Sequence, residues 1–325
     1  MESPMAEPFA RGRIADLFRE PAQSDSAGSY GRDDVGRPAR PRREAHGSET
    51  RDREGLTIRC AVEYDGTDYC GFQRQPNQRT VAGELEAAIS ALLGEPIALT
   101  SAGRTDTGVH ACGQVVSFTT ARIAFPWDRF ALALHTRLPR DIRVRDVATV
   151  APDFSARFSA LRRRYIYAIL ARPLPSALLA RYAWHLYRPL DIAAMRAAAL
   201  PLVGEHDFRS FCGTLPENGN TVRRIESLTI EPRGELTIVR VAANAFLHRM
   251  VRTIVGLLAE CAMGRRSPES VAAILAARDR AAAGVTAPAY GLYFAGVAYP
   301  DGYDSFAEPP MLGSTLGTSH EGDTA

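Results

Sequence analysis

A short turn at residues 101–118, SAGRTDTGVHACGQVVSF, holds the residue types that could do chemistry. It places Arg104 two positions before Asp106, with glycines on both sides and His110 close behind. An ionised carboxylate beside a cation can act as a nucleophile or as a general acid or base. Gly and Asp are also ordinary turn formers, and a local Arg–Asp pair is often only solvated. Evidence from the rest of the sequence is needed to distinguish a catalytic role of this segment from a purely structural one.

The composition is that of a globular protein with a basic central region. The chain has 325 residues, 46% of them hydrophobic, which is long enough for two domains or one large one. All 39 basic residues are Arg, and residues 56–300 carry 29 of them against 21 acids, so this region has a charge of +8. A basic body suits a polyanionic partner such as nucleic acid, although many basic domains bind none.

Several classes of protein are disfavoured. No apolar run approaches the roughly 20 residues that span a bilayer, and residues 1–55 contain 11 acids, unlike a transit peptide. We therefore expect a cytoplasmic protein without membrane contact. The five cysteines are odd in number and form no C-x-x-C pair, so neither a disulfide framework nor a metal site is indicated.

Pattern and composition divide the chain into four regions. Residues 1–55, rich in Pro, Gly, Ser and both charges, predict a disordered extension, and residues 301–325 predict a flexible acidic tail. Between them, strand and helix patterns alternate with many adjacent hairpin-like strands. We predict an α+β fold of two similar halves, residues 56–155 and 156–300, with mainly antiparallel sheets flanked by helices.

Individual elements follow from apolar periodicity and from helix start and stop residues. A helix is predicted after Thr80, with Gly94 as its stop, and another from about Phe246 to Met263. Pro201 interrupts a third predicted helix, which we expect to kink or stop early there. Strands are predicted at 56–66, 113–120, 141–150, 163–170, 223–231, 235–244 and 292–299.

Five segments resemble the tRNA pseudouridine synthase A family, and they occur in the family's order across residues 56–300. They are EYDGTDYCGFQRQ (63–75), GRTDTGVHACGQVVSF (103–118), ARFSALRRRYIY (156–167), NAFLHRMVRTIVG (244–256) and GLYFAGVAYP (291–300). The resemblance implies the pseudouridine synthase fold, with an RNA-binding cleft between the halves. It also implies an isomerase, without a cofactor, that converts uridines 38, 39 and 40 of the tRNA anticodon stem-loop to pseudouridine, and a homodimer that clamps one tRNA.

The resemblance carries roles onto particular residues. Asp106, in GRTD, matches the family's catalytic carboxylate. This carboxylate attacks the base, attacks the sugar or removes a sugar proton, and the sequence does not distinguish these three routes. Tyr165 matches the active-site Tyr that contacts the flipped uridine, and Arg104 resembles the residue that fills the vacated space. His248 and Arg252 share one flank of the predicted 246–263 helix. Arg252 is expected to pair with Asp106 and keep it ionised, because desolvation alone favours the protonated acid.

Four further residues are expected to contact the substrate: Arg163, Arg164, His110 and Leu292. Strand periodicity places Arg163 and Tyr165 on one face and Arg164 on the other. His110 either bonds RNA or fixes the turn, and Leu292 either walls the uracil pocket or packs in the core.

Two other functions remain as alternatives. A non-catalytic tRNA-binding or chaperone protein would keep a basic cleft without turnover, but binding alone does not need Asp106, Tyr165 and Arg252 together. A hydrolase would need a second carboxylate working with Asp106, as in glycoside cleavage.

Overall fold

The structure is a computed structural model that describes residues 55–300 and 302–312. The predicted extension, residues 1–55, therefore lies outside the described residues except for Gly55, and so does the part of the predicted tail from residue 313 onward. Among the described residues, no helix is long and apolar enough to cross a membrane.

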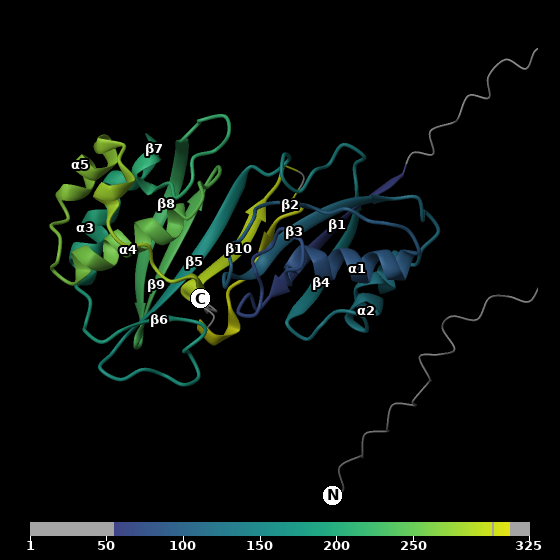
Figure 1. The fold of residues 1–325 in the computed structure, drawn as a ribbon, viewed down its shortest axis with the longest axis horizontal. Coiled ribbons are helices and arrows are strands. Elements are labelled where there is room, and N and C mark those ends of the chain that lie inside the picture. The colour runs from purple at the N-terminus through teal and green to yellow at the C-terminus, as the bar shows by residue number, and fades with distance from the viewer. Residues whose placement is uncertain (1–54, 301, 313–325) are drawn as a thin grey trace, which may run out of the picture. The chain divides into compact units, whose positions relative to one another are not determined.

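One mixed sheet of 11 strands organises the described residues (Figure 1). Its main path runs β4-β1-β3-β10-β5-β9-β8-β7, while β2, β6 and β11 pair with β3, β5 and β10. All pairings are antiparallel except β3 with β10 and β5 with β6. The strands are β1 (Leu56–Tyr64), β2 (Thr100–Ser101), β3 (His110–Thr120), β4 (Ile142–Val150), β5 (Arg162–Ala171), β6 (Trp184–Leu186), β7 (Gly204–Asp207), β8 (Val222–Arg233), β9 (Leu236–Ala243), β10 (Leu292–Ala298) and β11 (Ser305–Phe306).

Within the described residues five α-helices accompany the sheet, and the predicted α+β class with mainly antiparallel pairing is confirmed. They are α1 (Val81–Leu93), α2 (Phe130–His135), α3 (Ile192–Ala199), α4 (Met250–Ala262) and α5 (Ser270–Ala277). Short 3₁₀ turns lie at Trp127–Arg129, Leu200–Leu202, Arg209–Phe211, Arg280–Ala283, Ala289–Gly291 and Pro310–Leu312.

Helix α1 begins and ends where the sequence predicts. The Thr80 hydroxyl accepts a hydrogen bond from the amide of Gly83, and Gly94 closes the helix with a left-handed φ of 68°. Helix α3 stops at Ala199, and Pro201 falls in the 3₁₀ turn that follows it, as the missing amide of proline requires.

Helix α4 starts later than predicted. The sequence pattern places its start near Phe246, whereas the first helical residue is Met250. Arg249 has a φ of 59°, in the left-handed region, so a helix cannot continue through it. The segment Phe246–Arg249 is therefore a turn that enters the helix, and His248 does not lie on the helix surface.

The central strand β10 joins the two predicted halves. It pairs in parallel with β3 through Tyr293 and His110, and antiparallel with β5 through Phe294 and Tyr165. Strands of both predicted halves thus share one sheet. The division into residues 56–155 and 156–300 stays a prediction.

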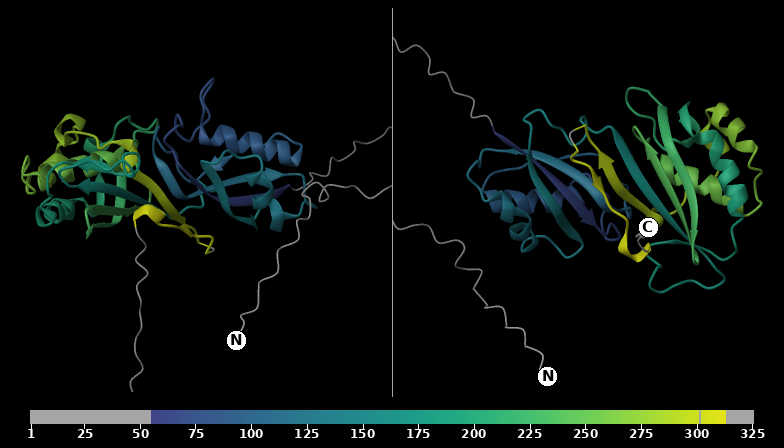
Figure 2. Two further views of the ribbon diagram at one scale, coloured as in Figure 1. Left: turned by 90° about the horizontal axis from the view of Figure 1, so that it is seen from below. Right: turned by 180° about the vertical axis from the view of Figure 1, so that it is seen from behind.

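The residues from 302 to 312 differ from the predicted flexible tail. Strand β11 pairs with β10, Leu312 is buried, and the Glu308 carboxylate binds Arg233 and Arg240. This segment crosses the sheet on the face opposite α1 (Figure 2) and covers a second apolar cluster that includes Ile166. The sequence pattern missed it because the apolar residues that anchor it are widely spaced.

Candidate active site

The turn that carries Asp106 is held from both sides. Its own backbone closes it, since the amide of Val109 donates to the carbonyl of Asp106 at 3.1 Å and Gly108 adopts a φ of 77°. The buried Thr105 hydroxyl lies 2.7 Å from the hydroxyl of Tyr64 on β1. These contacts fix the backbone on either side of the carboxylate to the sheet.

The first motif, residues 63–75, folds directly onto this turn. The amide of Phe72 donates to the carbonyl of Thr105 at 3.0 Å. A Cβ on Gly66 would stand 2.0 Å from the carbonyl oxygen of Val109, so no other residue fits there without a shift of the backbone. The two motifs are therefore one packed unit, although about 30 residues separate them in sequence.

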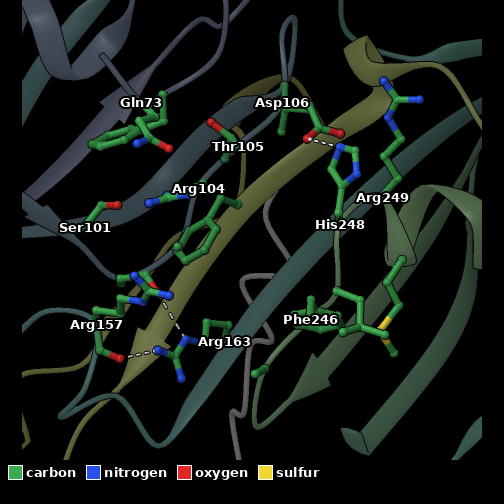
Figure 3. Close-up of a pocket in the computed structure, with 18 of the residues that line it drawn as sticks. Gln73, Ser101, Arg104, Thr105, Asp106, Arg157, Arg163, Phe246, His248 and Arg249 are labelled. Atoms are coloured by element: carbon green, nitrogen blue, oxygen red, sulfur yellow. Dashed lines mark hydrogen bonds and ion pairs between the residues drawn. The ribbon is translucent and has the colours of Figure 1, made fainter. Parts of the chain in front are cut away.

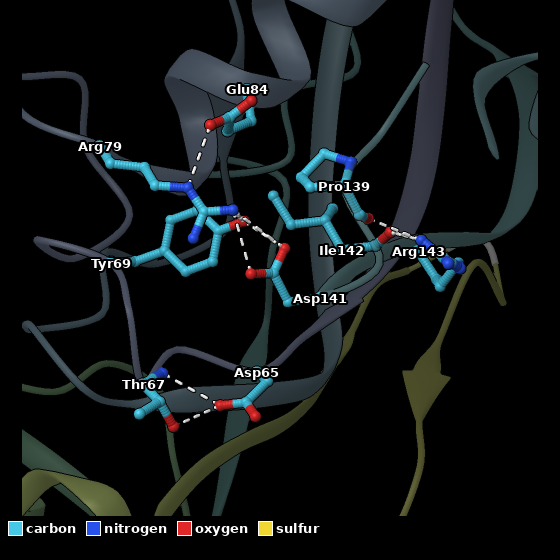
Figure 4. Close-up of polar contacts among 9 residues, drawn as sticks. All are labelled: Asp65, Thr67, Tyr69, Arg79, Glu84, Pro139, Asp141, Ile142 and Arg143. Carbon is cyan, nitrogen blue, oxygen red and sulfur yellow. Dashed lines mark hydrogen bonds and ion pairs between the residues drawn. The ribbon is translucent and has the colours of Figure 1, made fainter. Parts of the chain in front are cut away.

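A polar cluster anchors the loop that follows β1 (Figure 4). The Tyr69 hydroxyl donates to Asp141, and the Arg79 guanidinium binds the same carboxylate at 3.0 Å while lying over the Tyr69 ring. Asp65 accepts from both the amide and the hydroxyl of Thr67. The loop that carries Gly71 and Phe72 is thereby held at both ends.

Arg252, on α4, forms an ion pair with Asp106 across 146 positions of sequence. Its Nη1 lies 2.8 Å from Oδ2 of Asp106, and its Nε donates to the carbonyl of Ala287 at 2.8 Å. The Arg252 side chain is 15% exposed and that of Asp106 is 27% exposed. A charge-assisted pair that is partly shielded from water holds the carboxylate in one orientation.

His248 is the second side chain that lies beside the Asp106 carboxylate (Figure 3). Its Nε2 lies 3.6 Å from Oδ1, the oxygen that Arg252 does not bind, and its Nδ1 lies 3.0 Å from the hydroxyl of Thr214. The sequence pattern placed His248 on the same helical flank as Arg252. Both side chains reach Asp106, but His248 does so from the turn before α4.

Tyr165 and Leu292 lie in the wall of the same cavity. Tyr165 is buried on β5, where its ring meets those of Phe246 and Phe294 edge-on, each at 5.0 Å between centroids. Burial raises the pKa of the Tyr165 phenol far above its ordinary value. Leu292, at the start of β10, is also buried. Together they give the site an aromatic and apolar wall beside the carboxylate.

The cavity has a volume of about 1040 Å³ and an excess of positive charge. Three acids line it, Glu86, Asp106 and Glu217. Seven arginines line it: Arg74, Arg104, Arg157, Arg163, Arg223, Arg249 and Arg252. A cavity with this charge attracts an anionic ligand such as a phosphodiester backbone.

The arginines that the sequence singled out have different environments. Arg104 is exposed at the cavity and makes no hydrogen bond or ion pair within the part of the chain that the structure describes. Arg163 also lines the cavity, but its guanidinium donates to the carbonyl oxygens of Ala102, Arg157, Ala160 and Asn244. Arg163 therefore ties loops together, which differs from the expected contact with substrate.

Arg164 and His110 lie outside the cavity. Arg164 points to the opposite face of the sheet, with its guanidinium over the ring of Phe306 at 5.0 Å. His110 is buried, and its Nδ1 lies 3.1 Å from both the amide nitrogen of Gly66 and Oδ1 of Asp65, while its Nε2 lies 3.1 Å from the carbonyl of Tyr290. The alternative in which His110 fixes the turn agrees with this geometry, and direct contact with RNA does not.

Several residues that line the cavity were not predicted from the sequence. Arg157 and Phe246 lie within the matched segments 156–167 and 244–256, so those segments gave the only local signal for them. Thr214 and Arg223 lie outside all matched segments and reach the cavity through the loop before β8 and the start of that strand.

The cysteines and acids give no sign of a metal centre. All five cysteines are free, and burial raises the pKa of Cys60 and of Cys112 to about 12. No group of three or more His, Cys, Asp or Glu side chains is placed to hold a metal ion within residues 55–300 and 302–312.

The fold and site define an α+β protein with an Asp–Arg pair in an arginine-lined cavity. Residues 60–159 and 198–300 match the model of a family described as tRNA pseudouridine synthase. The tRNA pseudouridine synthase A of Halalkalibacterium halodurans is 48% identical over 232 residues, covering 71% of this chain and 88% of that protein. Those of Brevibacillus brevis and Methylococcus capsulatus are 46% and 44% identical, covering 74% and 76% of this chain and 99% and 90% of those proteins.

This chain belongs to the tRNA pseudouridine synthase family. It is an isomerase that converts uridine to pseudouridine in tRNA.

Proposed function

We propose that the enzyme isomerises uridines 38, 39 and 40 of the tRNA anticodon stem-loop, with Asp106 as the catalytic nucleophile. The observation that carries this proposal is the Asp106–Arg252 ion pair within the arginine-lined cavity. Isomerisation moves the uracil ring from an N1 to a C5 attachment, with no redox change. One ionised carboxylate serves such a reaction, and the ion pair with Arg252 orients Asp106 in the cavity.

A uridine in a stem has to leave the helix before it can react. Flipping the base out costs a few kcal/mol, which stacking and pocket contacts offset. Tyr165 and Leu292 supply the wall against which the uracil ring packs. Arg104, exposed and without a protein partner among the described residues, can stack in the vacated space or bond a phosphate through its planar guanidinium.

The alternative of a non-catalytic tRNA-binding protein has less support. A binding protein gains nothing from a carboxylate among seven cavity arginines, because that charge repels phosphate. A glycoside-type hydrolase would need a partner acid near Asp106. The described residues that approach its carboxylate, Arg252 and His248, are instead basic.

The test is Asp106→Asn, assayed by mapping pseudouridine in tRNA with carbodiimide and primer extension. Product at positions 38–40 should vanish, while tRNA affinity stays within about tenfold, or about 1.4 kcal/mol. Asp128→Asn is the matched control, because the Asp128 side chain is 78% exposed and does not line the cavity. Turnover near the wild-type rate in Asp106→Asn would refute the role of Asp106, and product elsewhere in tRNA would refute the proposed positions.

The homodimer and the cytoplasmic location stay predictions that rest on the family resemblance and on composition. Sedimentation of the free protein and of its tRNA complex would test the first. Fractionation of cells that express the full chain would test the second.

A further inference from the structure

The isomerisation moves one proton as well as one bond, whichever route Asp106 follows. In pseudouridine, C5 of the uracil ring has lost the hydrogen that it carried in uridine, and N1 has gained one. Formation of the bond between C5 and C1′ leaves C5 with both the sugar and its hydrogen. A base at the site has to remove that proton before the ring recovers its conjugation. This inference rests on the proposed function.

Most titratable groups of the cavity are unsuited to this task. Asp106 is the nucleophile in the proposed function. Tyr165 is buried among aromatic rings, and this burial raises the pKa of its phenol, which disfavours the phenolate that a base would need. The Glu86 carboxylate already accepts a hydrogen bond from the amide of Leu99 at 3.0 Å and lies 3.7 Å from the guanidinium of Arg74.

His248 has the position and the solvent exposure that removal of the C5 proton requires. Its side chain is 39% exposed, and the 3.6 Å between Nε2 and Asp106 is too long for a committed hydrogen bond. The loop before β8 holds the ring in place. The amide of Gly213 donates to the carbonyl of His248 at 2.8 Å, and the Thr214 hydroxyl lies 3.0 Å from Nδ1.

Gly213 shows how closely that loop packs on the imidazole. A Cβ at this position would stand 3.0 Å from Nδ1 of His248 and 3.2 Å from Cδ of Arg249. The Nδ1 side of the ring therefore faces this loop, and Nε2 points towards Asp106 (Figure 3). The charged groups around it are Asp106, Arg249 and Arg252.

We propose that His248 is the base that removes the proton from C5. A lone pair of the neutral imidazole takes the proton, the C5–H electron pair restores the bond between C5 and C6, and the ring electrons displaced to N1 accept a proton. The imidazolium can supply that proton directly or exchange it with water, so the protons balance. Where Asp106 attacks the sugar, its carboxylate is released when C5 joins C1′, and it stabilises the imidazolium as that forms; where Asp106 adds to C6 of the base, removal of the C5 proton is the step that expels it.

The experiment compares the wild type with His248→Gln and His248→Ala in single turnovers on tRNA carrying protium or deuterium at C5. Both variants should lower the rate by about 100-fold or more, with tRNA affinity within about tenfold. The C5 isotope effect should be larger than in the wild type, because proton removal becomes rate-limiting. Added imidazole should restore part of the rate of His248→Ala, whose vacated site opens to solvent.

His185→Gln is the control for the substitution, since His185 on β6 bonds the carbonyl of Arg172 and does not line the cavity. A His248→Gln enzyme with the wild-type rate would overturn the proposal. So would a slow but folded variant with an unchanged isotope effect and no response to imidazole. A wild-type enzyme that makes no pseudouridine at positions 38–40 would instead refute the proposed function, so the two failures are distinguishable.

Discussion

The amide of Phe72 donates to the carbonyl of Thr105, the residue before Asp106. Gly71 allows the two loop segments to approach so closely. Gly71 has a φ of 85°, and a Cβ there would stand 2.8 Å from the same Thr105 oxygen. The loop after β1 thus helps to position the turn that carries Asp106, the nucleophile in the proposed function.

Gly71→Ala should therefore lower both stability and turnover. The left-handed backbone costs about 1–3 kcal/mol for a side chain, and the contact with Thr105 displaces the Asp106 turn. Gly234→Ala is the matched control, because Gly234 has a φ of 59° with nothing within 4 Å of its Cβ position. The Gly234→Ala variant should lose stability only through the cost of its left-handed backbone conformation, with no loss of turnover. Urea unfolding and single-turnover rates measure both effects, and equal turnover in the two variants would contradict the argument.

Arg252→Ala should reduce turnover strongly while tRNA binding weakens far less, because the other cavity arginines remain. Arg252→Lys should recover only part of the rate. The guanidinium bonds Asp106 through Nη1 and Ala287 through Nε at once, and an ammonium group cannot match that forked geometry. Rates and filter-binding affinities measured on the same tRNA separate the two effects. Equal losses in rate and affinity would make Arg252 a phosphate contact instead.

Asp65 should contribute stability that depends on pH. Burial alone raises the pKa of Asp65, but its contacts with His110, Thr67 and Tyr182 outweigh burial and hold that pKa well below its usual range. A depressed pKa stabilises the fold above the pKa of the unfolded chain, about 4, and the contribution fades as pH falls below it. The difference in unfolding free energy between the wild type and Asp65→Asn should be constant above about pH 5 and shrink below about pH 4. A difference that grows towards acid pH would contradict this.

Glu308→Gln should destabilise the protein by about 1–3 kcal/mol. Its carboxylate, 18% exposed, lies 2.7 Å from Nη2 of Arg240 and 3.0 Å from Nη1 of Arg233, and so fixes the segment after β10 to the sheet. Glu235→Gln is the control, since Glu235 is 61% exposed in its pair with Arg172 and should change stability by less than about 1 kcal/mol. Urea midpoints for both variants test the prediction, which fails if the two are alike.

Local pattern predicted most strands, the α+β class and the faces on which Arg163, Arg164 and Tyr165 lie, because alternation along a strand is a property of neighbouring residues. The start of α4 could not be predicted this way. Phe246 and Met250 have helical spacing, yet Arg249 is left-handed where the chain packs on Gly213, 36 residues away. Contacts of that range leave no periodic signal.

For the site too, the sequence predicted the residues that lie in recognisable motifs and did not predict the roles that depend on long-range contacts. The family's motifs pointed to Asp106, Tyr165 and Arg252, and the structure places all three around one cavity. Arg163 and His110 have structural roles because they bond carbonyl oxygens of residues that are distant in sequence. A local sequence pattern cannot predict such contacts. The same is true of Thr214, which reaches the cavity only through tertiary packing.

The place of β10 in the sheet has a consequence for synthesis. During translation β3 and β5 emerge long before the strand that lies between them, so the sheet cannot close until residues 292–298 have left the ribosome. Until then each flank exposes a long unpaired edge, which is prone to mispairing with other chains. A nascent chain stalled before residue 292 should therefore be dependent on chaperones and inactive, even though Asp106 and Arg252 have both been made.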